Sequence, residues 1–262
     1  MNEDIRVQFE NAVRKALGDF KQRLEQQRFF QMQNSLLKEL HEKVKITGYC
    51  DSETIKKLSL EYDDSYRKLS ESGRSYENIV EEKNLIDTYS AFEKFLFDCF
   101  CSIYAFFPKY LGNEVSINTS DLFIDENIEL CKKNIIESKV KNLIQSNNIM
   151  EILKEFKKFG IKDKEIETYV SKDEKHILYE ISLVRNIVIH NNSIVNRIYM
   201  EQIRKFFKGR PRYPFDEGDT VLERLEDLVQ DLKDISTRVC EKIANAIIND
   251  SRRLEKHHET KN

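Results

Sequence analysis

A chain of 262 residues is long enough for one large helical domain, or for a smaller domain with a long extension. Charged residues make up 34% of it and only 7 Gly, 3 Pro and no Trp occur, so amphipathic helices can run with few breaks and an all-α fold is expected. The net charge of −3 argues against a protein that coats nucleic acid by bulk electrostatics, and leaves room only for a focused basic strip.

The cysteines and the N-terminus indicate the compartment. The cysteines form no CxxC pair, and their odd number favours reduced thiols; they are Cys50, Cys99, Cys101, Cys131 and Cys240. The start MNEDIRVQFE lacks the apolar core of a signal peptide, and no stretch approaches the roughly 18 apolar residues that span a bilayer. We expect a soluble, cytoplasmic protein that is not bound to a membrane.

Helical periodicity begins near the N-terminus. Apolar residues recur at helical spacing from Asp4 to about Val44, which predicts one long helix. Gly48 is expected to end it, and a second helix is expected over 53–70. Residues 1–72 are therefore predicted to form a helical extension, whose charged, heptad-like spacing favours dimerisation, partner docking or sensing.

The rest of the chain reads as further helices. Ser75 opens a helix with the most core-like segment, NLIDTYSAFEKFLFDCFCSIYAFF, up to Pro108, and turn formers over 109–127 predict a loop. Ser171 and Glu174 form a capping box before a helix that ends near Asn191. Other helices are expected over 128–146, 148–159, 163–170, 197–208 and 220–248, followed by a flexible polar tail over 251–262.

The helix that opens at Ser171 carries a polar stripe near its end, in SLVRNIVIHNNSIVNRIY. At about 100° per residue, Arg185, Asn186 and His190 fall on one side, and the aliphatic residues Ile177, Ile181, Val184 and Val188 fall on the other. Asn186 and His190 are four residues apart and can touch, whereas Arg185 and His190 lie about 140° apart and would flank a groove.

These residue types suit phosphodiester chemistry without a metal. An imidazole with a pKa near 6.5 can move a proton at neutral pH, and a guanidinium can hold a phosphate by two parallel hydrogen bonds. The asparagine can orient the imidazole or satisfy buried polar groups. No H-x-x-x-H, clustered Asp pair or Cys/His grouping suggests a metal ligand set, so no cofactor is expected.

The six residues from Arg185 to His190, RNIVIH, resemble the motif of the HEPN-domain ribonucleases. These helical bundles carry an Arg, a polar residue, three further residues and a His near the end of a helix. The resemblance covers about 75–248, and YSAFEKFLFD is similar to the Ser-x-x-Glu first helix of several bacterial members. It implies a HEPN-like domain over 73–250 with Arg185, Asn186 and His190 as catalytic residues.

The resemblance also implies a mechanism and partners. Two copies would pair about a two-fold axis and form a composite active site. One His190 would take the proton of the ribose 2′-hydroxyl, its mate would protonate the leaving 5′-oxygen, and Arg185 would stabilise the phosphate charge. RNA would be cut to 2′,3′-cyclic phosphate and 5′-hydroxyl ends, and DNA would be inert. The family implies a toxin or abortive-infection (phage-defence) effector, with an antitoxin or sensor as a possible partner.

A basic strip follows the motif, in NRIYMEQIRKFFKGRPRY. Basic residues interleaved with aromatic ones can track phosphates and stack on bases. The expected substrate-binding residues are Arg204, Lys205, Lys208, Arg210 and Arg212.

Other interpretations remain open. Without the family resemblance, Arg185 and His190 are an interface arginine and a histidine that complements the helix dipole. Glu93 either reaches Arg185 or lies in a solvated gap, which is the commoner situation. The whole protein could instead be a non-catalytic helical interaction module for a protein or nucleotide, or a target of nucleotidyl transfer with Tyr199 as acceptor.

Overall fold

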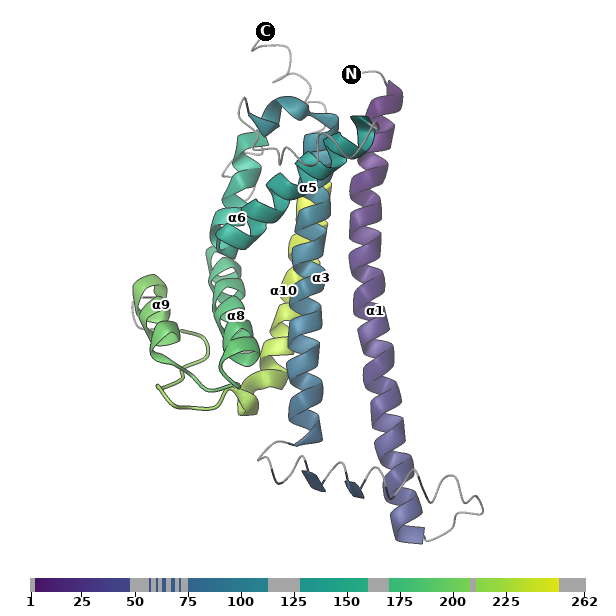
Figure 1. Cartoon of the computed structure of the whole chain (residues 1–262), viewed down its shortest axis with the longest axis vertical. Coiled ribbons are helices and arrows are strands. Elements are labelled where there is room, and N and C mark those ends of the chain that lie inside the picture. Colours follow the sequence, from purple (N-terminus) through teal and green to yellow (C-terminus); the bar gives the residue numbers. More distant parts are fainter. Residues whose placement is uncertain are drawn as a thin grey trace.

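The computed structural model describes residues 3–47, 75–112, 128–159, 170–207 and 211–249, with isolated positions between 57 and 71. Every regular element in these ranges is a helix (Figure 1), which confirms the all-α prediction. Within them, no helix is both long and apolar enough to cross a membrane. The predictions that lie wholly or largely outside the described residues are the helices over 53–70 and 163–170, the loop over 109–127 and the tail over 251–262.

Helix α1 (Glu3–Thr47) is the predicted long N-terminal helix, and it runs beside α3 (Tyr76–Phe106) in Figure 1. Its first half buries an apolar stripe at helical spacing, formed by Phe9, Val13, Ala16 and Phe20. The ring of Phe9 meets those of Phe106 and Phe107 edge to face, at 5.5 and 5.2 Å between centroids. This half of α1 therefore belongs to the same core as the rest, and the division at residues 72–73 remains a prediction.

Helix α3 is the central element, because it packs against α1, α5, α8 and α10. Ser75 caps it as predicted, its hydroxyl accepting a hydrogen bond from the backbone N–H of Asn78 at 3.1 Å. Pro108 opens the short 3₁₀ helix η1 (Pro108–Leu111) directly after it. The most enclosed apolar side chains of α3 are Leu85, Phe92, Phe95, Leu96, Cys99, Phe100 and Ile103.

Helices α5 (Ile128–Ser146) and α6 (Ile149–Glu155) cover one end of α3 and α8. The helix expected over 148–159 is divided, since its last residues form the 3₁₀ helix η2 (Phe156–Phe159). Both phenylalanines of η2 pack on the ring of Phe100, at 4.5 and 5.9 Å between centroids. Aromatic packing thus fixes α6 against α3.

Helix α8 (Lys172–His190) has the predicted capping box, and Asn191 is its C-cap. Its aliphatic face, with Ile181, Val184 and Val188, is buried. After it come α9 (Arg197–Phe207), the 3₁₀ helix η3 (Leu222–Arg224) and α10 (Leu225–Asn249), which packs on α1, α3 and α8. The last α-helix begins later than expected, because a 3₁₀ turn precedes it.

A tight turn anchors the end of α8. Asn192 and Ser193 have positive φ values of 53° and 62°, in the left-handed region that reverses the chain. Ser193 is buried, and its hydroxyl donates a hydrogen bond to the carboxylate of Glu82 on α3. Ile194 then forms an isolated β-bridge with Thr220. The turn thereby holds the C-terminal end of α8 against α3 and the segment before α10.

Candidate functional site

A cleft of about 810 Å³ opens beside the polar stripe of α8. Side chains from α3, α5, α6, α8 and α9 line it. Arg185 and Asn186 lie on its wall, whereas His190 is not one of the lining residues. The predicted motif is thus divided between a cleft and the exposed end of a helix.

Three neighbours hold Arg185 on the cleft wall. Its Nη2 lies 4.0 Å from Oε2 of Glu93, its Nη1 donates to Oδ1 of Asn186 at 3.2 Å, and its Cζ lies 5.7 Å from the ring centroid of Tyr89. Its Nε is enclosed, with no acceptor within reach among the described residues. Glu93 therefore reaches Arg185, where the sequence alone favoured a solvated gap, and Asn186 contacts Arg185.

The surroundings leave the charge of Arg185 only partly compensated. Burial raises the pKa of Glu93, and the nearby Arg185 offsets part of this rise. Burial also raises the pKa of the Tyr89 hydroxyl, with a further contribution from the Glu93 charge, so this phenol stays neutral. The 4.0 Å separation between Nη2 and the Glu93 carboxylate is longer than a hydrogen bond, and 25% of the Arg185 side chain is exposed, so the guanidinium can still bind an added anion.

His190 is the last residue of α8 and is exposed. Three aliphatic side chains near it in the chain are exposed too: Ile189 by 38%, Ile194 by 44% and Ile198 by 69%. We call these three residues the isoleucine patch. Exposed apolar side chains close in the chain to an exposed imidazole are compatible with a surface that a second molecule covers.

The chain matches no protein-family model, no curated protein and no solved structure. The residues of the site must therefore carry any functional conclusion. Within the described ranges, no group of three or more His, Cys, Asp or Glu side chains is arranged to hold a metal ion.

The basic strip is dispersed. Arg204 and Lys205 are exposed on the last turn of α9, while Lys208 and Arg210 lie outside the described residues. Two aromatic residues of the strip, Phe206 and Phe207, pack on the ring of Tyr179 at 4.4 and 6.1 Å between centroids. The structure describes three of the five predicted substrate-binding residues, Arg204, Lys205 and Arg212, and all three are exposed.

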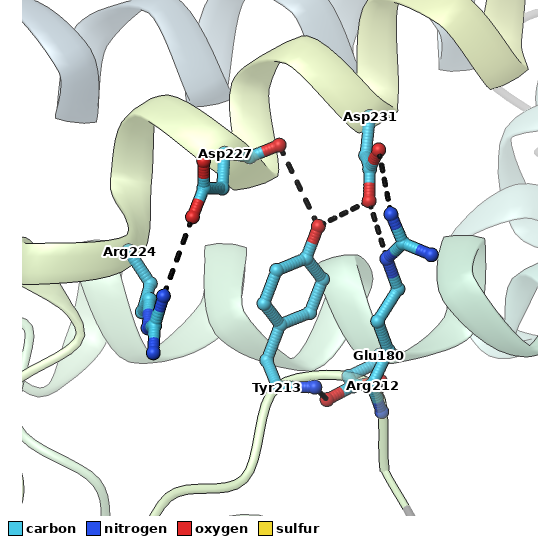
Figure 2. A network of polar contacts seen from close by, with 6 residues as sticks. All are labelled: Glu180, Arg212, Tyr213, Arg224, Asp227 and Asp231. Atoms are coloured by element: carbon cyan, nitrogen blue, oxygen red, sulfur yellow. Dashed lines mark hydrogen bonds and ion pairs between the residues drawn. The ribbon is translucent and has the colours of Figure 1, made fainter.

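The fifth, Arg212, belongs to a polar network with α8 and α10 (Figure 2). Its Nε lies 2.6 Å from Oδ2 of Asp231, and its Nη2 donates to Oδ1 of the same carboxylate at 3.1 Å. The Tyr213 hydroxyl donates to Asp231 as well. This bidentate pairing assigns Arg212 a structural contact that the sequence did not predict.

Glu180 lies on the other side of this network, and the sequence did not predict its role. Its side chain is fully buried, and its two oxygens accept hydrogen bonds from the backbone N–H groups of Arg212 at 2.9 Å and Tyr213 at 2.8 Å. Burial raises its pKa to about 7, against the lowering effect of these bonds and of Arg212. The sequence held one sign that Glu180 is buried: on α8 it lies about 40° around the helix axis from the buried Val184.

Tyr199 does not offer an accessible acceptor. Its side chain is only 3% exposed, and its hydroxyl is enclosed without a partner among the described residues. A nucleotidyl-transfer enzyme needs a solvent-facing hydroxyl, so modification at Tyr199 does not fit this structure.

Proposed function

We propose that the protein is a metal-independent endoribonuclease of the HEPN type, with a HEPN-like bundle and a homodimeric active site. One observation supports it most directly. Arg185 stands on the wall of a cleft, held by Glu93 from α3, and His190 is exposed further along the same helix. An oriented guanidinium and an accessible imidazole are the two groups that metal-free RNA cleavage requires.

In the proposed reaction, the ribose 2′-oxygen attacks phosphorus and the bond from phosphorus to the 5′-oxygen breaks. The proton of the 2′-hydroxyl passes to a neutral His190. A protonated His190 from the second copy gives its proton to the departing 5′-oxygen. Arg185 binds the phosphate oxygens as negative charge grows on them, which yields a 2′,3′-cyclic phosphate and a 5′-hydroxyl.

The isoleucine patch supports the homodimer. One chain supplies a single His190 at the site, whereas the reaction uses a base and an acid. A two-fold axis through the patch would bury its apolar surface and bring both imidazoles to one linkage. The same association would desolvate Arg185 and strengthen its hold on phosphate.

We further propose, from the family resemblance, a toxin or phage-defence effector that responds to an antitoxin or sensor partner. The second half of α1 presents large apolar side chains that are 56–62% exposed: Phe29, Phe30, Met32, Leu36 and Leu37. Such a stripe fits a partner helix. It also favours the second candidate function, a non-catalytic helical interaction module.

An assay on end-labelled, single-stranded RNA in the presence of EDTA tests the proposal. We expect wild-type protein to produce cyclic-phosphate ends, and Arg185→Ala and His190→Ala each to lower the rate by at least about a thousandfold. Arg224→Ala, which changes an arginine 59% exposed on η3 and outside both the cleft and the basic strip, is the matched control. Circular dichroism checks that each variant is folded.

Three outcomes would contradict the ribonuclease. Cleavage could persist in both Arg185→Ala and His190→Ala, which indicates a contaminating nuclease. Cleavage could stop in EDTA, which indicates a metal enzyme. RNA could stay intact both in the assay and in cells that express the wild-type chain, which would favour the interaction module.

A further inference from the structure

The cleft beside Arg185 extends beyond the predicted motif onto α5. Lys141 and Gln145 lie one turn apart on the same face of α5, and both line the cleft and are exposed. Lys141 forms no ion pair within the described part of the chain. Neither residue is needed to pack the core, so both are available to a ligand.

The charges of the cleft wall favour an anion. The lining holds three cations, Lys94, Lys141 and Arg185, against one carboxylate, that of Glu93. Lys94 is paired with Asp98 on its own helix, and Arg185 is paired only loosely, with its Nη2 4.0 Å from Glu93, so Lys141 and Arg185 are the cations left to bind a ligand. These two belong to different helices, so they can engage different phosphates of one chain.

The remaining wall combines apolar surface with amide groups. Gln202 Oε1 accepts a hydrogen bond from the Tyr179 hydroxyl at 3.0 Å, which orients this amide and leaves its NH₂ group as a donor. Gln145 adds a second amide. Apart from Ile198, which belongs to the isoleucine patch, the apolar part of the lining consists of Phe97, Ile144, Ile149, Ile152 and Leu183. A flat heterocycle with polar edges suits such a wall, and a cavity of several hundred Å³ has room for it.

We infer that this cleft binds the nucleotide next to the scissile linkage of a single-stranded RNA, with its base between the apolar wall and the amides of Gln145 and Gln202, and its outer phosphate on Lys141. The inference rests on the proposed ribonuclease function, in which Arg185 binds the scissile phosphate at the edge of the same cleft. Because the base of the neighbouring nucleotide then lies in the cleft, the cleft selects which base is accepted next to the cleaved linkage.

A cleavage experiment tests the selection. RNA with random bases on both sides of the cut is digested by wild type and variants, and the ends are sequenced. We expect a base preference on one side, which Gln145→Ala reduces by about threefold to tenfold. Lys141→Ala should raise KM about fivefold, and Lys133→Ala, an exposed lysine of α5 outside the cleft, should match wild type.

A binding experiment separates this inference from the proposed function. A DNA oligonucleotide with 5-bromouracil lacks the 2′-hydroxyl, so it binds without cleavage. Irradiation should cross-link it to peptides of α5, α6 or α9 that line the cleft, and Lys141→Ala should weaken its binding while Lys133→Ala does not.

Each result has one meaning. Cross-links in the cleft from a protein that does not cut RNA would support the binding site and contradict the ribonuclease. RNA cleavage with cross-links elsewhere, and with Lys141→Ala and Gln145→Ala identical to wild type, would overturn the inference and leave the ribonuclease standing.

Discussion

The guanidinium of Arg185 lies 4.0 Å from the carboxylate of Glu93, across the contact between α8 and α3. The orientation of the proposed phosphate-binding group is thus set by a second helix as well as its own. Both side chains are partly exposed, by 25% and 30%, so the pair contributes little to the stability of the fold. Its effect should appear in catalysis.

Replacing Glu93 should therefore slow cleavage without unfolding the protein. Glu93→Gln keeps the shape and removes the charge, so Arg185 loses one of the groups that orient it. We expect kcat to fall by about tenfold or more while KM changes little. The melting temperature should stay within about 2 °C of wild type. Glu81→Gln, on the same helix outside the cleft, is the control, and equal rates for both variants would contradict a positioning role.

The buried Glu180 should make stability depend on pH. Its pKa is about 7 in the folded protein and 4.5 ordinarily, so the folded state binds the proton more tightly. The contribution of this group is complete below about pH 4.5 and is lost as pH rises through 7, by at most about 3 kcal/mol.

Glu180→Gln removes that titration. Urea unfolding of wild type and variant between about pH 5 and pH 8 measures the difference between their free energies of unfolding. As pH rises, the free energy of unfolding of wild type should fall relative to that of the variant. Parallel pH profiles would show that Glu180 keeps an ordinary pKa, whatever the absolute stability of the variant.

The turn after α8 should be sensitive to the loss of one hydroxyl. Ser193→Ala removes the buried donor to Glu82, at a cost of about 1–3 kcal/mol. Ser102→Ala removes a partly buried hydroxyl that donates to the carbonyl oxygen of Asp98 in its own helix, and it should be nearly neutral. Differential scanning calorimetry compares the two, and similar melting temperatures would show that the buried bond contributes little.

The exposed cations of α9 should differ from Arg212 in how they affect RNA binding. Arg204→Ala and Lys205→Ala should each reduce the slope of log K against log[salt] by about 0.7, and leave stability unchanged. Arg212→Ala should leave the salt slope nearly unchanged, because Asp231 already pairs with this guanidinium at two atoms, and should change the melting temperature little, because the Arg212 side chain is 54% exposed. A salt slope that falls in Arg212→Ala as it does in Arg204→Ala would show that Arg212 also binds phosphate.

If the active site is composite, an inactive chain should abolish the activity of the wild-type chain with which it forms a dimer. When His190→Ala is mixed with an equal amount of wild type and the subunits are exchanged, only about a quarter of the dimers have two wild-type chains. Activity per total protein should then fall to about a quarter of the wild-type value. A fall to about half, as simple dilution gives, would indicate that each chain works alone.

The helices and the exposed stripe of α8 were predictable because both depend on residues close together in the chain. The capping box of Ser171 and Glu174 and the division of α8 into buried and polar faces follow from helical geometry alone. Cross-helix contacts do not follow from it. Arg212 was assigned to RNA from its charge, whereas packing places Asp231 of α10 beside it.

Local spacing by itself determined an all-helical chain and the placing of Arg185, Asn186 and His190 on one side of a helix. Only the tertiary structure decided that Glu93 reaches Arg185, that Glu180 supports the backbone at Arg212, and that Tyr199 is enclosed. The physical reason is that a helix repeats every 3.6 residues whatever surrounds it, while the partner of a side chain on another helix depends on how the two surfaces interlock.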